Sequence, residues 1–251
     1  MRNRITVLLS FILVTTGYFI SGRAILDRPD FRDAPADMAS DFDTGIPLVP
    51  DKADVPVPAV PYMITPPITG NVPISNFGVA IWKDSENGKP EGLLFRGATP
   101  EGEAAFRFLG GLGVKTVINL QVTHTGDKEL CAANGIECLE FRIVPSPTVI
   151  FSKNKQFLQA FKRAADDMKA GRKVFIHCQG GRHRTGALVT ALALRNIACG
   201  KSVNKTELGL YVEKMLKEYG FYNFYGSLLA EWEKEIRGWA DNFEGNQWIC
   251  E

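Results

Sequence analysis

Residues 177–186, His-Cys-Gln-Gly-Gly-Arg-His-Arg-Thr-Gly, decide the fold of this chain. The strand-like run Lys173–Ile176 precedes this stretch and the apolar, helix-like run Ala187–Ala198 follows it, so a strand-to-helix turn is predicted. Gly180 and Gly181 permit tight backbone dihedrals, so that successive N–H groups can point inward. The N-terminus of the following helix adds positive potential. The stretch therefore predicts an anion-binding turn.

The side chains of this turn suit phosphoryl transfer through a covalent cysteine phosphate. A thiol at the start of such a turn is expected to ionise easily, and the thiolate is the nucleophile. Cys178 would attack phosphorus, and Arg184 would hold two equatorial oxygens with its planar guanidinium. The hydroxyl of Thr185 could assist departure of the thiolate and hydrolysis of the intermediate. His177 is expected to order the loop by hydrogen bonding.

The turn matches the His-Cys-x-x-Gly-x-x-Arg-Thr/Ser-Gly signature of the protein tyrosine phosphatase superfamily, and the chain resembles its compact dual-specificity branch. The ending of the turn is similar to that of the atypical plant and fungal type and its bacterial relatives, several of which act on inositol phosphates. The resemblance covers about residues 75–240, including LFRGATP at 94–100 and GVKTVINL at 113–120.

This resemblance implies a cysteine-dependent phosphatase with Cys178 as nucleophile, Arg184 as phosphate-binding arginine and Thr185 as the hydrolysis-assisting hydroxyl. The backbone amides that it implies for the phosphate cradle belong to Gln179, Gly180, Gly181, Arg182, His183 and Arg184. The alternative is a noncatalytic module that only binds phosphate.

The general acid is the part that the sequence does not supply. The family usually carries an aspartate roughly thirty to forty residues before the cysteine, where it protonates the leaving oxygen. Here Ile143–Lys155 contains no carboxylate, Glu140 precedes that loop, and Asp166 and Asp167 fall late in a predicted helix. His183 could donate the proton instead, or could act as a loop-stabilising or substrate-binding cation. A missing acid matters least for weakly basic leaving groups, as in aryl phosphates or phosphoanhydrides.

The substrate could be a phosphorylated small molecule or a phosphoprotein. A cationic rim that would favour a small polyanion such as an inositol phosphate could be formed by Arg182, His183, His124, Lys153 and Lys155. The alternative is that these are solvated loop charges. A phosphotyrosine pocket needs an aromatic wall, to which Phe151 and Tyr222 could contribute. Gln121 stands where the family often has an arginine, so the anion contact that this arginine would make has no arginine to make it here.

Short apolar strands alternate with helices through the domain, which predicts an α/β fold. We expect a central, largely parallel sheet with helices on both faces and the Cys178 turn at the carboxyl end of a strand. The strands are expected at residues 79–82, 93–95, 116–120, 136–143 and 173–177. The helices are expected at residues 99–109, 127–133, 157–168, 187–198, 204–219 and 224–240. Thr99, followed by Pro100, is the expected N-cap of the first helix.

The N-terminal part of the chain is distinct from this domain. Arg2 and Arg4 precede the apolar run 5–20, which predicts that residues 1–24 are a signal peptide or a short membrane anchor. Nine of the fourteen prolines lie within residues 27–70, so residues 25–72 read as a Pro/Asp-rich tether before the domain at 73–245. Alternatively, residues 55–68 form an ordered arm on the domain. The prediction is an exported protein, periplasmic or extracellular, that could attach to a membrane through its N-terminus.

Composition adds a few exclusions. A formal net charge of +1 and a pI of about 7.6 give no reason to expect nucleic-acid binding. The three histidines lie too far from suitable cysteine pairs for zinc, and neither a metal nor a cofactor is predicted. Outside the turn, Cys131 and Cys138 could pair, as could Cys199 and Cys250, or each could be a small core hydrophobe. Export would expose a reactive Cys178 to oxidation.

Overall fold

A computed structural model describes residues 72–84, 90–123, 127–219 and 227–251. The predicted leader lies outside these residues, as do His124, Tyr222 and all of the predicted tether except its last residue.

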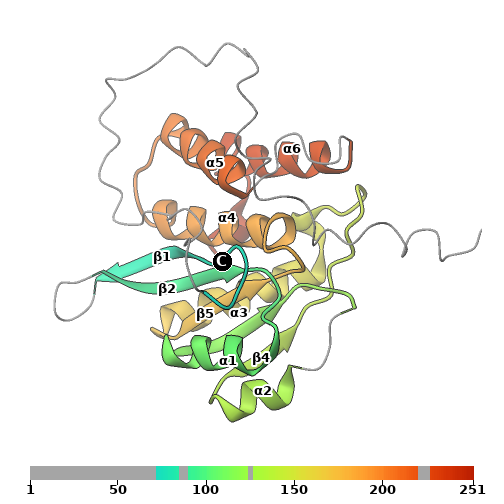
Figure 1. Cartoon of the computed structure of the whole chain (residues 1–251). Helices are drawn as coiled ribbons and strands as arrows, with labels where there is room; N and C mark the ends of the chain where they lie inside the picture. The colour runs from blue at the N-terminus through green and yellow to red at the C-terminus, as the bar shows by residue number, and fades with distance from the viewer. Residues whose placement is uncertain (1–71, 85–89, 124–126, 220–226) are drawn as a thin grey trace, which may run out of the picture. The chain divides into compact units, whose positions relative to one another are not determined.

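The described residues form an α/β fold around one five-stranded sheet (Figure 1). Its strands are β1 (Gly78–Asp84), β2 (Pro90–Gly97), β3 (Val114–Asn119), β4 (Glu137–Glu140) and β5 (Lys173–His177). They lie in the order β1-β2-β5-β3-β4; β1 and β2 are antiparallel, and the other neighbours are parallel. The prediction of a largely parallel sheet is confirmed. Because β5 is central, the turn that follows it lies between the carboxyl ends of β2 and β3.

Helices cover both faces of this sheet, as predicted. They are α1 (Gly102–Gly111), α2 (Lys128–Ala133), α3 (Lys155–Lys169), α4 (His183–Ala198), α5 (Lys205–Tyr219) and α6 (Ser227–Asp241), with short 3₁₀ turns η4 (Phe151–Lys153) and η5 (Gln247–Ile249). In Figure 1, α4 lies on one side of the sheet with α5 and α6 beyond it, whereas α1 and α2 lie on the other side. Helix α3 shares a core with α4, and α4 is the element that leaves the predicted anion-binding turn.

Two apolar clusters fill the two faces. The cluster under α1 and α2 is centred on Phe77, Phe106 and Phe175. The larger cluster joins α3 and α4 to α5 and α6, and Phe151 and Trp232 meet there edge to face with ring centroids 4.9 Å apart. The apolar stripes of the last two helices are therefore core at the positions whose side chains are described: Leu208, Met215, Leu229, Trp232, Ile236 and Trp239 are buried, and Tyr211 is partly buried.

Several boundaries differ from the predicted ones; β2, for example, begins at Pro90 rather than at residue 93, and three further differences have a local explanation. The N-cap of α1 is Glu101 and not Thr99, because the Thr99 hydroxyl instead donates to the carbonyls that follow β5. Helix α4 begins at His183, four residues earlier than predicted, because the end of the turn already has helical geometry. Strand β4 ends at Glu140 rather than at Ile143.

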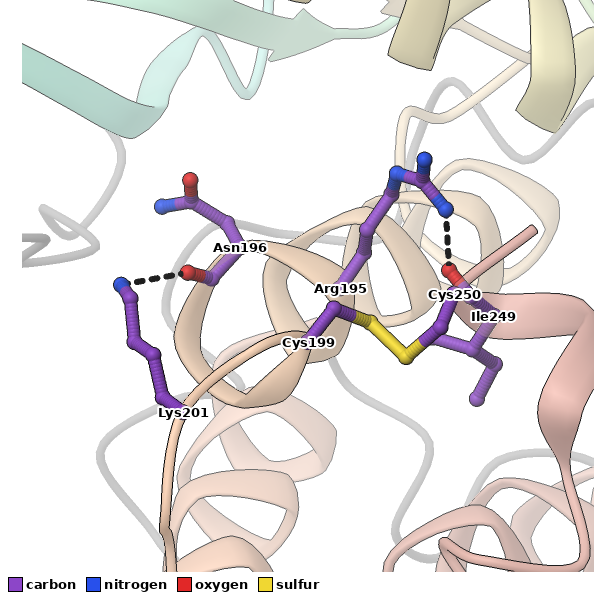
Figure 2. The surroundings of a disulfide bond; sticks show 6 residues. All are labelled: Arg195, Asn196, Cys199, Lys201, Ile249 and Cys250. Carbon is purple, nitrogen blue, oxygen red and sulfur yellow. Dashed lines mark hydrogen bonds between the residues drawn. A yellow bond between two sulfur atoms is a disulfide. The ribbon is translucent and has the colours of Figure 1, made fainter.

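Both cysteine pairs that the sequence left open form disulfides. Cys131–Cys138 joins α2 to β4, and Cys199–Cys250 joins the end of α4 to the segment after η5. Figure 2 shows the second bond, with Arg195 on α4 donating through Nη1 to the Ile249 carbonyl at 2.7 Å. The chain after α6 is thereby fixed to the far end of the helix whose first turn carries Arg184.

Within the described ranges, no helix has both the length and the apolar character needed to cross a bilayer.

Candidate active site

The predicted turn lies at the carboxyl end of β5, as expected. Cys178 directly follows the strand, is only 3% exposed and is the one free cysteine among the described residues. Gly181 has a φ of +67°, a conformation that L side chains rarely adopt. A β-carbon on Gly181 would also lie 2.2 Å from the carbonyl carbon of Gly97 at the end of β2. The turn can therefore pack against β2 only with glycine at this position.

Arg184 lies in the first turn of α4 and is 8% exposed. Its Nη1 donates to the carbonyl oxygens of Leu120 at 3.2 Å and Ile143 at 3.1 Å. These carbonyls follow β3 and β4, so the guanidinium lies beside the carboxyl ends of these two strands. Within the described residues, Nε and Nη2 of Arg184 have no hydrogen-bond partner. Both remain available to an oxyanion, which a planar guanidinium can bind through two parallel bonds.

Two further side chains of the turn, those of Thr185 and His177, are fully buried. Thr185 is fully buried, and its hydroxyl has no hydrogen-bond partner among the described residues. His177 is also fully buried; its ring stacks on Phe175 with centroids 5.7 Å apart, and its carbonyl accepts from the Leu120 amide at 2.9 Å. These contacts fix His177 at the end of β5, directly before Cys178, and its role in ordering the loop stays a prediction.

The turn is also held from outside by polar contacts. The amide of Thr99 donates to the Gln179 carbonyl at 3.1 Å, and the Thr99 hydroxyl lies 3.4 Å from the carbonyl oxygens of both Cys178 and Gln179. Asn76 Nδ2 donates to the Gly180 carbonyl at 3.0 Å. Sequence reasoning missed both residues. The only available signal was the Thr99-Pro100 pair, which instead predicted a helix cap.

The loop that would supply a general acid begins beside the arginine, because the Ile143 carbonyl accepts from Arg184. Residues 141–155 contain no carboxylate, so this loop provides no acid. Glu140, just before it, lies at the end of β4 and pairs with Arg142 at 3.2 Å.

The two aspartates of α3 lie far along the fold from the turn. Asp167 is fully buried and accepts from Thr116 Oγ1 at 2.6 Å near the beginning of β3, whereas the turn follows the end of β5. Asp166 is exposed and pairs with Lys162 at 3.3 Å. Neither carboxylate lies at the carboxyl edge of the sheet, and the general acid stays unassigned.

The predicted rim residues are only partly brought to this site. Arg182, Lys153 and Lys155 are exposed, and His183 is half-buried in the first turn of α4. Phe151 is fully buried between Phe157 and Trp232, so the prediction that it could form the wall of a phosphotyrosine pocket is wrong. Gln121, in the place of a family arginine, is buried, and its Nε2 donates to Thr99 Oγ1 at 2.7 Å.

A largely parallel sheet with a buried cysteine and an arginine at the two ends of one glycine-containing turn defines a cysteine-dependent phosphatase domain of the compact dual-specificity type. A family model described as "Swiss Army Knife protein, DSP-PTPase phosphatase domain" matches residues 91–217, half of the chain, and the chain belongs to this family.

Among solved structures, the fold is similar to TpbA from P. aeruginosa, with 18% identity, a TM-score of 0.45, and coverage of 62% of this chain and 85% of that chain. It is also similar to the core catalytic domain of the PP-IP phosphatase SIW14 from S. cerevisiae, with 19% identity, a TM-score of 0.45, and coverage of 62% and 86% respectively. No curated protein matches the chain.

Proposed function

We propose that this phosphatase hydrolyses phosphate monoesters through a phosphocysteine intermediate formed on Cys178. The sulfur anion attacks phosphorus, and the bond to the ester oxygen breaks with its electron pair leaving on that oxygen. Water then attacks the phosphocysteine, and the thiolate departs as inorganic phosphate forms. The observation that carries the proposal is the placement of a buried, unpaired thiol at the start of the turn whose other end presents Arg184.

The binding of the phosphoryl group is assigned to the turn itself. The amides of residues 179–184 would surround its oxygens, supported by the positive end of α4. Nε and Nη2 of Arg184 would hold two of these oxygens, while Nη1 keeps the guanidinium in place through the Leu120 and Ile143 carbonyls. The buried hydroxyl of Thr185 would assist the second step, in which the thiolate leaves.

The chemistry of the leaving group follows from the acid-free loop. Without a carboxylate in residues 141–155, the leaving oxygen must depart unprotonated or take its proton from another group such as His183. We therefore expect a steep dependence of the first step on the leaving group. In a series of aryl phosphates, the rate should rise strongly as the pKa of the phenol falls, and a flat dependence would contradict the absence of an acid.

The favoured substrate is a small polyphosphorylated molecule of the inositol phosphate type. This proposal is supported by the exposed Arg182 of the turn and by the exposed Lys153 and Lys155 at the end of the acid-free loop. A phosphotyrosine substrate is the second candidate, and one observation favours it. Val144 and Ile150, in the same loop, are 55% and 46% exposed, and they could contact an aromatic leaving group.

A substrate panel compared with Cys178→Ser tests these proposals. The wild type should release phosphate from inositol hexakisphosphate faster than from a phosphotyrosine peptide, and the reverse ranking would favour a protein phosphatase. Cys178→Ser should abolish turnover on every substrate, an expected loss of about 10⁴-fold or more, while it retains anion binding. Ordinary turnover by this variant would eliminate the covalent mechanism. Anion binding by the wild type without turnover would identify a noncatalytic module.

We also propose that the protein is exported and could be anchored by residues 5–20. The apolar run after Arg2 and Arg4 supports this proposal, and so do the two disulfides, which persist in oxidising compartments. Fractionation of cells that express the full chain tests it: the protein should be found outside the cytosol, and an intact leader on a cytosolic protein would contradict export.

A further inference from the structure

The directions of the carbonyl groups in the turn determine the directions of its amide N–H groups. In a trans peptide, the C=O of one residue and the N–H of the next point in opposite directions in one plane. A cradle whose N–H groups converge on an anion must therefore turn the preceding carbonyls outward. Each outward carbonyl can then be fixed by a donor on the outer side of the turn.

Donors are present at three consecutive peptide groups. The Thr99 hydroxyl reaches the Cys178 carbonyl, the Thr99 amide donates to the Gln179 carbonyl, and Asn76 Nδ2 donates to the Gly180 carbonyl. These contacts set the planes that carry the N–H groups of residues 179, 180 and 181. The donors come from two segments that precede the turn by about eighty to a hundred residues.

The Thr99 hydroxyl is itself oriented. Its oxygen accepts a hydrogen bond from Gln121 Nε2 at 2.7 Å, so its proton is directed toward the turn carbonyls. Gln121 is in turn fixed by its backbone amide, which donates to Asn119 Oδ1 at 2.8 Å. Gln121 therefore supports the cradle through Thr99.

Asn76 is held in a similar way. It is the one described residue other than glycine with a positive φ, at 56°, a conformation that asparagine adopts more readily than most residues. The fully buried Arg96 donates through Nη1 to the Asn76 carbonyl at 3.2 Å and to its Oδ1 at 3.3 Å. With Oδ1 facing the guanidinium, the Nδ2 group of the same amide faces Gly180.

We propose that Asn76 and Thr99 are positioning residues that fix three peptide planes of the phosphate cradle before the anion binds. They touch neither the sulfur nor the phosphoryl group in this assignment, and they act through the carbonyls of Cys178, Gln179 and Gly180. The inference rests on the proposed function for its effect on turnover, but its effect on the binding of an inorganic anion can be measured without any turnover.

The test measures the affinity of the full chain for inorganic phosphate by calorimetry. Thr99→Val keeps the shape and the backbone N–H but removes the hydroxyl, and Asn76→Gly keeps the backbone conformation but removes the amide donor. Each variant should weaken phosphate binding by about threefold to tenfold, the range expected for one hydrogen bond, and the double variant should be weaker than either. Thr99→Ser, which retains the hydroxyl, should restore the wild-type affinity.

Thr116→Val is the matched control. Thr116 is also a threonine with a hydrogen-bonded hydroxyl; it is fully buried, whereas Thr99 is partly buried, and its partner is Asp167 near the beginning of β3. This variant should lower the melting temperature and leave phosphate affinity unchanged. Unchanged phosphate affinity in Thr99→Val and Asn76→Gly, with only a lower melting temperature, would overturn the proposal. So would a Thr99→Ser variant that binds phosphate as weakly as Thr99→Val.

The two proposals can fail separately. If phosphate affinity changes as expected but the wild type shows no cysteine-dependent turnover, the positioning role stands and the proposed function fails. If turnover depends on Cys178 and phosphate affinity does not respond to either positioning variant, the proposed function stands and the positioning role fails.

Discussion

The two ends of the parallel sheet use charge in opposite ways. Near the beginnings of β3 and β4, the buried Asp167 accepts hydrogen bonds from Thr116 Oγ1 at 2.6 Å, from Arg163 Nε at 3.1 Å and from Arg172. Arg163 also bonds Glu137. At the carboxyl end, Arg184 donates only to backbone carbonyls, and no carboxylate among the described residues pairs with it.

This difference separates stability from function. Burial raises the pKa of Asp167, but the hydrogen bonds from Thr116, Arg172 and Arg163 outweigh it and hold that pKa below its ordinary value. The hydrogen bond that Arg163 donates to Glu137 raises the pKa of Arg163. At the amino end of the sheet, the buried carboxylate of Asp167 is therefore compensated by Arg163 and Arg172. The carboxyl end leaves its arginine charge uncompensated, so an incoming anion can complete it.

The largest effect on activity should follow from a substitution of the arginine at the carboxyl end of the sheet. Arg184→Lys replaces a planar group that can bind two oxygens with a point charge that cannot also bond the Leu120 and Ile143 carbonyls. We expect kcat/KM to fall by about 10²- to 10³-fold and phosphate binding to weaken, since one charge-assisted pair of bonds is lost. Steady-state kinetics and calorimetry measure the two effects.

Arg195→Lys is the control for this substitution. Arg195 lies on the same helix, but its guanidinium donates to the Ile249 carbonyl at the other end (Figure 2). This variant should keep wild-type kcat/KM. Equal losses in the two variants would mean that Arg184 acts through the helix and not on the anion.

Removal of the buried carboxylate at the amino end of the sheet should affect stability alone. Asp167→Asn leaves Arg163 and Arg172 without their buried carboxylate, and we expect a loss of about 3 kcal/mol in the free energy of unfolding at neutral pH. The activity of the molecules that remain folded should be unchanged. Denaturant unfolding measures the effect, and Asp166→Asn, at the adjacent exposed aspartate, should cost less than about 1 kcal/mol.

The pH dependence of this loss has a definite sign. The folded pKa of Asp167 is depressed, so its contribution is fully present above the pKa of an unfolded aspartate, about 3.9, and disappears as the pH falls through the lower folded value. The difference between Asp167→Asn and wild type should shrink below about pH 4. A difference that grows on acidification would contradict the assigned pKa direction.

Much of the fold could be predicted because its signals are local. The strand at 173–177 has the predicted bounds, since an apolar run ends there at the glycine-containing turn. The stripes of α5 and α6 are buried wherever their side chains are described, apart from the partly buried Tyr211, because a helical period of apolar residues leaves one face to cover. Cys178 and Arg184 could be assigned to one turn for the same reason, as both lie within one ten-residue stretch.

The supports of the site could not be predicted because they join distant segments. Thr99 has the local pattern of a helix cap, but its hydroxyl bonds carbonyls about eighty residues away, and no local preference indicates this choice. Asn76 and Gln121 show only polar character in the sequence. Asp167 falls in an amphipathic helix, where a buried aspartate is unexpected until Thr116, Arg163 and Arg172 are seen around it.

The smallest expected effect concerns the one buried hydroxyl of the turn that the fold leaves unpaired. Thr185→Val removes a hydroxyl that has no partner among the described residues, so we expect the free energy of unfolding to rise, by about 1 kcal/mol. The same change should slow hydrolysis of the phosphocysteine by about tenfold, the effect of losing one hydrogen bond to the departing sulfur. With an aryl phosphate, rapid release of one equivalent of phenol should then precede a slower steady state.

Thr190→Val, five residues later on α4, separates these two effects. Its hydroxyl is equally buried but donates to the Gly186 carbonyl at 2.8 Å, so its removal should lower stability and produce no burst. Thr185→Ser should keep the wild-type steady state because it keeps the hydroxyl. Thr185→Val could instead lose stability as Thr190→Val does and show no burst. That outcome would assign the hydroxyl of Thr185 to packing of the helix and would remove it from the groups that act in the reaction.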